Sequence, residues 1–356
     1  MMNIAIDSAL LAAAIRDGAA AKKSTLEILT CARLEAHGET LTVTTFDTLV
    51  RVTARLPATV LSPGALCVSA DKLRAAMAGG GLVELTETSA SLMVKRGSSS
   101  RVRLETRPAD EFPTFDGLRW TDAGIDPEAL ASAIDASDYA MARNDIRQYL
   151  CGIQVAQRYI GATDGYRMAM LRTPNDVTQI IIPRAGIGAL RRRLDGAKSL
   201  QLGLSSSGRP TRIALRGDDD LEIQLVDVKA PDLEIIIPHA DPRAELTIES
   251  AALLAAIDRL MPFCTRPIKG GSTSGCLISI SPDGLRIATK DEESFELVSV
   301  ESMTGETTRG GVDLNYIREA VAAIGAKIIR IEDNTDRFIL SADGTQQIHV
   351  AMGMRL

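Results

Sequence analysis

Ile6-Asp7-Ser8-Ala9-Leu10 is the stretch that decides the fold, because the chain repeats its pattern twice. Ile125-Asp126-Pro127-Glu128-Ala129-Leu130 and Ile248-Glu249-Ser250-Ala251-Ala252-Leu253 follow at spacings of 119 and 123 residues. Each stretch places a β-favouring residue before an acidic or Ser cap and an Ala/Leu-rich run, which is typical of a strand leading into a helix. A spacing close to one third of 356 residues indicates three domain-sized repeats.

A second anchor recurs inside each third of the chain. Val68–Leu73, Ile182–Ile187 and Val312–Ile317 each end a β-like stretch and begin an amphipathic helix of about three turns. Glycines that can stop these helices are Gly79, Gly196 and Gly325. Alternating apolar and polar residues between the helices predict strands. We therefore expect an α+β protein of three tandem similar domains, at residues 1–120, 121–243 and 244–356.

Composition excludes several classes of protein. The chain is 45% hydrophobic and 24% charged, as in ordinary globular proteins, with no apolar run long enough for a transmembrane helix. The N-terminus lacks the basic start of a signal peptide. Five scattered cysteines and three separate histidines predict neither disulfides nor a metal site, and we expect a cytoplasmic protein without a cofactor. A net charge of −6 means that any DNA-binding surface must be local.

Three domains in a row leave an exposed sheet edge at each end. Head-to-tail pairing of two copies would close these edges into a ring. Candidate edges are Arg101–Glu105 and Phe295–Ser299, whose charges are partly complementary. Twelve helices about 9 Å apart, lining the inside, would leave a hole of about 25 Å, wide enough for a nucleic-acid duplex. The residues expected at the dimer interface are Lys72, Val102, Leu104, Phe295 and Leu297.

Five motifs in chain order resemble the bacterial DNA polymerase III beta subunit, the sliding clamp. They are Asp110–Pro113, Arg147–Gly152, Ala162–Ala169, Ile181–Arg184 and the closing Met352-Gly353-Met354-Arg355-Leu356. The resemblance covers all three domains. It implies a head-to-tail homodimeric ring with helices inside and sheets outside, which encircles duplex DNA as a processivity factor without enzymatic activity. It also implies polymerase, clamp-loader and repair partners that insert a short motif of the Gln-x-x-Leu-Phe type.

The resemblance places the partner-peptide pocket between the second and third domains. The residues implied are Leu150, Thr163, Gly165, Tyr166, Arg167, Met168, Pro231, Ile236, Asp313, Tyr316, Val350, Met352, Gly353, Met354, Arg355 and Leu356. Three features depart from the family pattern. Gly353 replaces a proline, which we expect to loosen the backbone. Asp313 replaces an asparagine, and the connector around Pro231 lacks its usual aromatic and basic residues.

DNA contact should be independent of sequence and made through phosphates. The best local cluster of positive charge is Arg184, Arg191, Arg192, Arg193 and Lys198. The resemblance adds Lys23, Arg143, Arg147 and Tyr149 as residues facing DNA.

Several alternatives stay open. Arg191–Arg193 could be an ordinary solvated helix face, and Tyr316 could be core packing. Asp164 is interpreted as a turn-stabilising residue before Gly165 and not as a catalytic base. At the level of the whole protein, the alternatives are a clamp-like scaffold with a restricted set of partners and, less favoured, an α+β enzyme acting on nucleotides.

Overall fold

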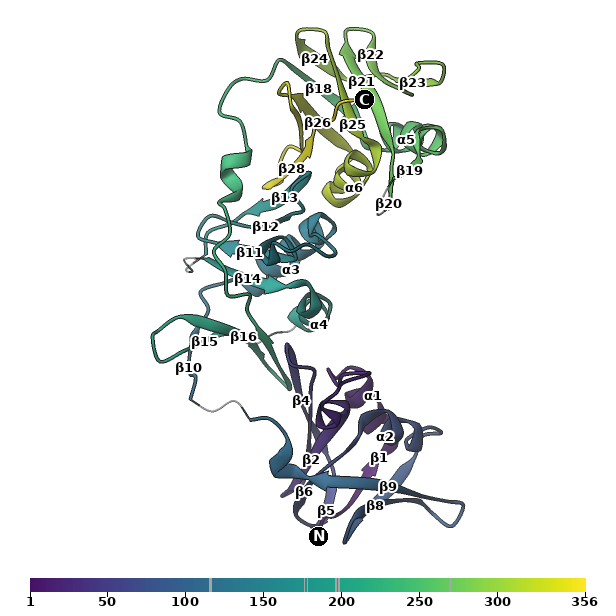
Figure 1. Cartoon of the computed structure of the whole chain (residues 1–356), viewed down its shortest axis with the longest axis vertical. Coiled ribbons are helices and arrows are strands. Elements are labelled where there is room, and N and C mark those ends of the chain that lie inside the picture. Colours follow the sequence, from purple (N-terminus) through teal and green to yellow (C-terminus); the bar gives the residue numbers. More distant parts are fainter. Residues whose placement is uncertain (115–116, 176, 178, 196, 198, 269–270) are drawn as a thin grey trace. The chain divides into compact units, whose positions relative to one another are not determined.

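The computed structural model describes residues 1–114, 117–175, 177, 179–195, 197, 199–268 and 271–356. Helices and antiparallel sheets alternate along the chain (Figure 1), as expected for the α+β class. The described part divides into two compact units. The first unit contains Met1–Pro127 and Ala185–Leu225, and the second contains Glu128–Arg184 and Val226–Leu356. Among the described residues, no helix is long and apolar enough to cross a membrane.

Six helices begin at the two predicted anchors of each repeat. They are α1 (Ser8–Arg16), α2 (Ala70–Ala76), α3 (Pro127–Ser137), α4 (Arg184–Leu194), α5 (Ser250–Cys264) and α6 (Leu314–Ile324). The Asp7 carboxylate caps α1 by accepting from the Ala9 N–H at 2.7 Å. Gly325, with φ of 66°, ends α6 as predicted, whereas α2 stops at Ala76, before Gly79. Gly196 lies outside the described residues.

The first unit contains one sheet of thirteen strands, in which β17 pairs with β4. This pairing joins strands of the first and second sequence repeats. In spatial order the strands are β10 (Arg119–Asp122), β15 (Ser199–Leu204), β16 (Pro210–Arg216), β17 (Asp219–Gln224), β4 (Val50–Pro57), β3 (Thr40–Phe46), β2 (Cys31–His37), β6 (Gly64–Ser69), β9 (Ser100–Pro108), β8 (Ser91–Arg96), β7 (Leu82–Thr88), β1 (Asn3–Asp7) and β5 (Thr59–Ser62).

The second unit contains a nine-stranded sheet, in which β13 pairs with β28 and so joins the second and third repeats. Its order is β14 (Gln179–Pro183), β11 (Gly152–Ala156), β12 (Tyr159–Thr163), β13 (Arg167–Arg172), β28 (Gln347–Met352), β27 (Arg337–Ser341), β26 (Ile328–Asp333), β18 (Ala244–Glu249) and β24 (Ser302–Gly305). A four-stranded sheet has the order β23 (Phe295–Val298), β22 (Gly284–Ala288), β21 (Gly275–Ser281) and β25 (Thr308–Asp313). The short strands β19 (Arg266–Ile268) and β20 (Gly271–Thr273) form a separate pair.

Paired helices cover the apolar cores of the first and third repeats. Helices α1 and α2 lie side by side, as do α5 and α6 (Figure 1). Leu11 and Leu73 are fully buried in the first core, and Leu253 and Leu314 in the third. Because β17–β4 and β13–β28 connect different repeats, the two compact units do not follow the repeat boundaries. The division at residues 120 and 243 therefore stays a prediction.

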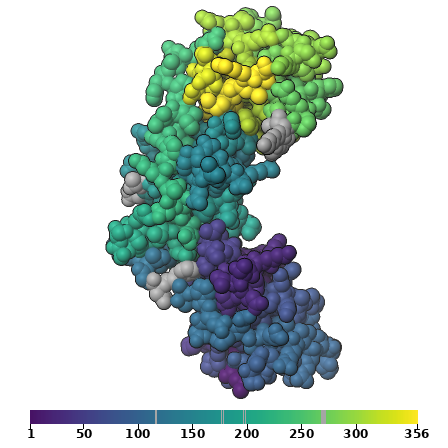
Figure 2. Space-filling view, in the orientation of Figure 1, coloured from purple at the N-terminus to yellow at the C-terminus, as the bar shows by residue number. Residues whose placement is uncertain are grey.

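The last residues of the chain pack on glycines of the four-stranded sheet. The Met354 N–H donates to the Gly311 carbonyl oxygen at 2.8 Å. A Cβ on Gly275 would lie 2.8 Å from the Leu356 side chain, and a Cβ on Gly311 would overlap the Met354 carbonyl. The C-terminal residues, in yellow, form part of the surface in Figure 2. Glycine at these two positions therefore provides the space in which the tail lies.

This packing predicts that Gly311→Ala destabilises the protein by about 1–3 kcal/mol, because the added methyl group must displace the tail. Urea unfolding of the two proteins measures the difference. Gly217→Ala is the control, since a Cβ there would meet Asp219 at an ordinary 3.6 Å. Equal stability of the Gly311 variant and the wild type would show that the tail does not depend on this space.

Candidate partner pocket and nucleic-acid interface

A cavity of about 250 Å³ opens in the second unit where β13 and β28 pair. One wall comes from these strands, and the other from the connector that includes the short helix η5 (Leu233–Ile236). Apolar side chains make up most of the cavity, with polar groups at its rim. The lining residues are Thr163, Gly165, Arg167, Met168, Ile235, Ile236, Arg337, Val350 and Met352.

The turn between β12 and β13 forms the rim of the cavity. The Asp164 carboxylate accepts from the N–H groups of Tyr166 and Arg167 at 2.9 and 3.0 Å. The Thr163 hydroxyl donates to the Arg167 carbonyl at 2.6 Å. Gly165 has φ of 92°, a conformation that glycine adopts without strain. Asp164 therefore stabilises the turn, as the sequence predicted.

The Arg167 side chain makes cation–π contacts and ion pairs with residues of both the second and the third repeat. Its guanidinium carbon lies 5.3 Å from the Tyr139 ring centre and 5.0 Å from that of Tyr316. Its Nε is 3.0 Å from the Asp164 carboxylate, and its Nη1 donates to Glu319 on α6. Cation–π contacts and ion pairs are strongest where water is excluded, and this side chain is only 15% exposed. Arg167 thus fastens the pocket rim to α6.

A half-buried tyrosine, Tyr139, and a buried histidine, His349, continue this network. The Tyr139 hydroxyl and His349 Nδ1 are 2.8 Å apart, and the two rings stack at an interplanar angle of 11°. His349 Nε2 lies 3.1 Å from Gln347 Oε1. Burial lowers the pKa of His349 to about 4, because the charged imidazolium would lose its hydration. The imidazole is therefore neutral at physiological pH.

Seven of the pocket residues implied by the resemblance line the cavity: Thr163, Gly165, Arg167, Met168, Ile236, Val350 and Met352. Two lining residues were missed, Ile235 and Arg337. The remaining implied residues lie outside its lining: Leu150, Tyr166, Pro231, Asp313, Tyr316, Gly353, Met354, Arg355 and Leu356. Tyr166 is 65% exposed, whereas Leu150 is buried.

Asp313 and Gly353, where the resemblance implied asparagine and proline, have local structural partners. Buried Asp313 caps α6 by accepting from the Asn315 N–H at 3.0 Å, and it also accepts from the Thr273 hydroxyl at 2.8 Å. Gly353 donates its N–H to the Asp336 carbonyl at 2.7 Å. The loosened backbone expected at Gly353 stays a prediction.

The arginines of α4 have different roles. Arg184 and Arg192 are exposed, and Arg191 pairs with Asp195 at 3.2 Å. Arg193 donates to the Asp17 carbonyl at 2.6 Å, and burial lowers its pKa. The three neighbouring arginines therefore differ in their partners, and their contact with DNA stays a prediction. Lys198 lies outside the described residues.

The other implied DNA-facing residues follow the first helix of their repeat, with Tyr149 in the short helix η4 (Gln148–Leu150). Lys23 and Arg143 are exposed, and Tyr149 is half-buried. Arg147 forms a two-pronged pair with Asp145, with both distances 3.0 Å. The Arg147 guanidinium lowers the pKa of the Asp145 carboxyl to about 2. The charge of Arg147 is thus neutralised by Asp145, whereas Lys23 and Arg143 expose their positive charges to solvent.

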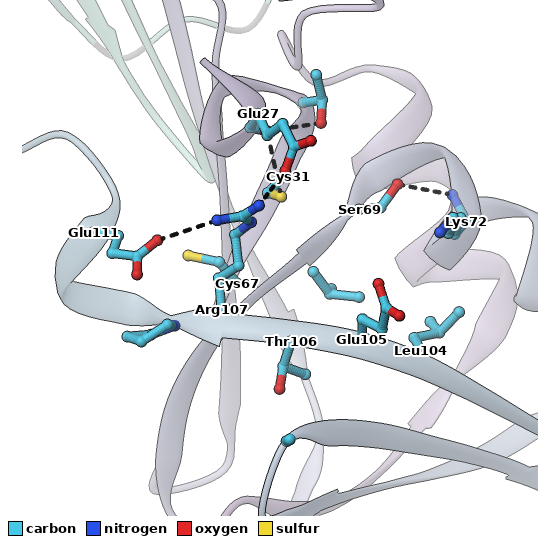
Figure 3. Close-up of a pocket in the computed structure, with 14 residues that line it drawn as sticks. Glu27, Cys31, Cys67, Ser69, Lys72, Leu104, Glu105, Thr106, Arg107 and Glu111 are labelled. Carbon is cyan, nitrogen blue, oxygen red and sulfur yellow. Dashed lines mark hydrogen bonds and ion pairs between the residues drawn. The ribbon is translucent and has the colours of Figure 1, made fainter. Parts of the chain in front are cut away.

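In the described structure, both strands predicted to form the dimer interface have a side on which their backbone groups pair with no other strand. Only Thr106–Pro108 of β9 pair with β6, which leaves one side of Arg101–Glu105 without a strand. A cavity of about 650 Å³ adjoins this edge, lined by Lys72 and Leu104 among others (Figure 3). Strand β23 ends its sheet, with Phe295 and Leu297 more than half exposed. Val102, also on β9, is half-buried.

Comparison with known proteins finds matches to the family that the sequence motifs resemble, along most of the chain. The family model described as DNA polymerase III beta subunit, N-terminal domain, matches residues 2–116, and that of the central domain matches residues 124–232. The beta sliding clamp of Pseudomonas aeruginosa is 29% identical over 95% of both chains, and that of Escherichia coli is 27% identical over 94% of both. A crystal structure of the P. aeruginosa beta subunit superposes with a TM-score of 0.86 at 26% identity, covering both chains fully.

The buried His349 predicts that stability falls as the pH drops from about 6.5 to about 4. In this window the unfolded histidine binds a proton that the folded one excludes, so the free energy of unfolding decreases by up to about 3 kcal/mol. Urea unfolding at pH 7 and pH 4.5 measures the loss in the wild type and in His349→Gln. Carboxylates contribute equally to both proteins, so an identical loss would rule out the histidine as its source.

Proposed function

Because this chain belongs to the DNA polymerase III beta-subunit family, the bacterial sliding clamps, we propose that two copies close head to tail into a ring around duplex DNA. The chain is a sliding clamp, a processivity factor for DNA synthesis. A ring that holds DNA by enclosure needs no reaction of its own, and we infer that the protein is not an enzyme. We expect the protein to be located in the bacterial cytoplasm, where the DNA lies.

The main support for the proposed ring is that β23, and β9 over most of its length, each have one side along which no other strand pairs in the described structure. An edge with free N–H and C=O groups invites another strand, and soluble proteins usually cover or charge it. Glu296 of β23 already pairs with Arg259 of its own chain at 2.6 Å, so Arg101 and Arg103 on β9 of the partner copy would have to share that carboxylate. Leu297 and Phe295 would lose their exposure in the same contact. The exposed apolar surface therefore supports this pairing more strongly than the charges do.

The cavity at the β13–β28 junction supports a peptide-binding hub. Met168 and Met352 provide an adaptable apolar surface, and methionine-rich surfaces suit several partners. We propose that polymerase, clamp-loader and repair partners each insert a short motif of the Gln-x-x-Leu-Phe type here. The apolar end of the motif would enter the cavity, and its polar residue would meet the Thr163–Arg167 rim.

The alternative of a clamp with a restricted set of partners rests on the connector. Ile235, which lacks a basic or aromatic character, is 76% exposed at the pocket mouth. A pocket mouth changed in this way would bind a narrower range of motifs. It would not change the ring or the way in which the protein binds DNA.

The ring predicts a particle of twice the 38.0 kDa chain mass at micromolar concentration. Leu297→Lys should convert it into monomers, because an ammonium group would be buried in the seam next to Arg101 and Arg103 of the partner copy. Sedimentation velocity measures the mass. Leu82→Lys is the control, since Leu82 on β7 is 67% exposed and lies away from the uncovered edges. A wild-type protein that is monomeric up to high micromolar concentration would contradict the ring.

DNA binding should depend on exposed cations and not on Arg193. Lys23→Ala, Arg143→Ala and Arg192→Ala should each reduce the slope of log affinity against log salt by about 0.9 for every phosphate that the variant no longer neutralises. Fluorescence anisotropy with a labelled duplex at several salt concentrations gives the slope. Arg193→Ala is the matched comparison: it should lower stability and leave the slope unchanged. A reduced slope in that variant alone would reverse our assignment of the two arginines.

A further inference from the structure

The segment of residues 21–29, which follows α1 and ends in the short helix η1 (Glu27–Thr30), is closed by its own hydrogen bonds. The Ala21 N–H donates to the Leu29 carbonyl oxygen at 2.9 Å, and the Ser24 hydroxyl accepts from the Leu26 N–H at 3.1 Å. Leu29 is buried at the base of the segment, whereas the Leu26 side chain is 62% exposed. The exposed leucine is therefore presented by a closed turn of the backbone.

The segment of residues 142–150, which follows α3 and ends in η4, has the same arrangement in the second repeat. The Ala142 N–H donates to the carbonyl oxygen of buried Leu150 at 2.9 Å, and the Asp145 carboxylate accepts from the Arg147 N–H at 2.8 Å. Ile146 lies between the two residues of the latter bond and is 98% exposed. This is the highest exposed fraction among the large hydrophobic residues of the described structure. Two segments with the same closing bonds thus each present one aliphatic side chain to solvent.

Exposed cations stand close to both aliphatic side chains in the sequence. Lys22 and Lys23 precede Leu26, and Arg143 precedes Ile146. In the part of the chain that the structure describes, none of these three cations forms an ion pair. A polyanion would neutralise the charges, and its surface between the anionic groups would have to match an aliphatic side chain. Duplex DNA meets both requirements, because deoxyribose carbons lie between its phosphates and proteins contact both groups.

Two kinds of apolar contact with a duplex are possible, and their energies decide between them. A side chain can insert between base pairs, or it can pack against the sugars in the wall of a groove. Unstacking a base step costs about as much as the burial of one aliphatic side chain returns, so that insertion would bring no net gain. Insertion would also hold a sliding ring in one place. Packing against sugars leaves the base stack intact and is the same at every position.

We propose that Leu26 and Ile146 pack against the deoxyribose groups of duplex DNA and supply a part of the binding affinity that does not depend on salt. Lys23 and Arg143 bind the neighbouring phosphates and supply the part that does. Because the turns are closed before binding, little conformational entropy is lost when the side chains are covered. This inference rests on the proposed clamp function and adds an apolar component to its contact with DNA.

The test uses Leu26→Asn and Ile146→Asn, which keep the approximate size of the side chain and remove its apolar character. Fluorescence anisotropy with a labelled duplex measures the affinity of the full-length protein at several salt concentrations. Each variant should bind about three- to tenfold more weakly at every salt concentration, the loss expected when about 25–55 Å² of apolar surface is no longer buried. The slope of log affinity against log salt should stay at the wild-type value, because no cation is removed. A second duplex of unrelated sequence should show the same loss.

Leu61→Asn is the matched control, since Leu61 on β5 is 70% exposed and belongs to neither segment, and it should bind DNA as the wild type does. Ile146→Val keeps an aliphatic side chain and should retain most of the affinity. Wild-type affinity in both asparagine variants would overturn the inference and leave the clamp function intact. A loss of affinity with a reduced salt slope would also overturn it, because the variant would then have displaced a phosphate contact. A wild-type protein that does not bind the duplex would contradict the proposed DNA binding itself, and this inference with it.

Discussion

Backbone hydrogen bonding between strands of different repeats is the constraint on which the rest of the structure depends. Strand β17 pairs with β4, and β13 pairs with β28, so each sheet continues from one repeat into the next. At the second junction Met168 lies opposite Val350, and both residues line the pocket. A one-residue shift in that register would turn each of these side chains to the opposite face. The ladder that connects two repeats therefore also creates the binding site.

Arginine serves two purposes in this fold, and burial distinguishes them. Arg167 and Arg193 are partly buried and hold elements together through carboxylate, aromatic or carbonyl partners. Arg192 and Arg143 are exposed. Exposed charges keep their hydration and exchange partners easily, which suits a surface along which DNA slides. If the proposed clamp function holds DNA by phosphate contacts, a few such exposed cations would be enough for a protein with net charge −6.

The sequence predicted the features that depend on neighbouring residues. Helix starts at Ser8, Ser250 and Leu314 follow from caps and periodicity, and the turn at Asp164 follows from its preference for the position before glycine. Arg337 and Ile235 were missed, because their position depends on how the connector meets a strand about a hundred residues away. Arg193 could not be told from Arg192, since the difference lies in its hydrogen bond to Asp17, which is 176 residues away in the sequence. Contacts between residues far apart in the sequence depend on how strands and loops pack in the folded chain, and local sequence patterns do not specify that packing.

The hydrogen bond from Gly353 to Asp336 limits which residues the chain accepts at this position. Proline, which the resemblance implies here, has no N–H to donate, and a Cβ there would approach the Asp336 carbonyl to 2.9 Å. A proline at position 353 would therefore require the β26–β27 turn to shift as well. The turn and the C-terminal segment thus constrain each other's substitutions, although they lie at opposite ends of β27 and β28 in the sequence.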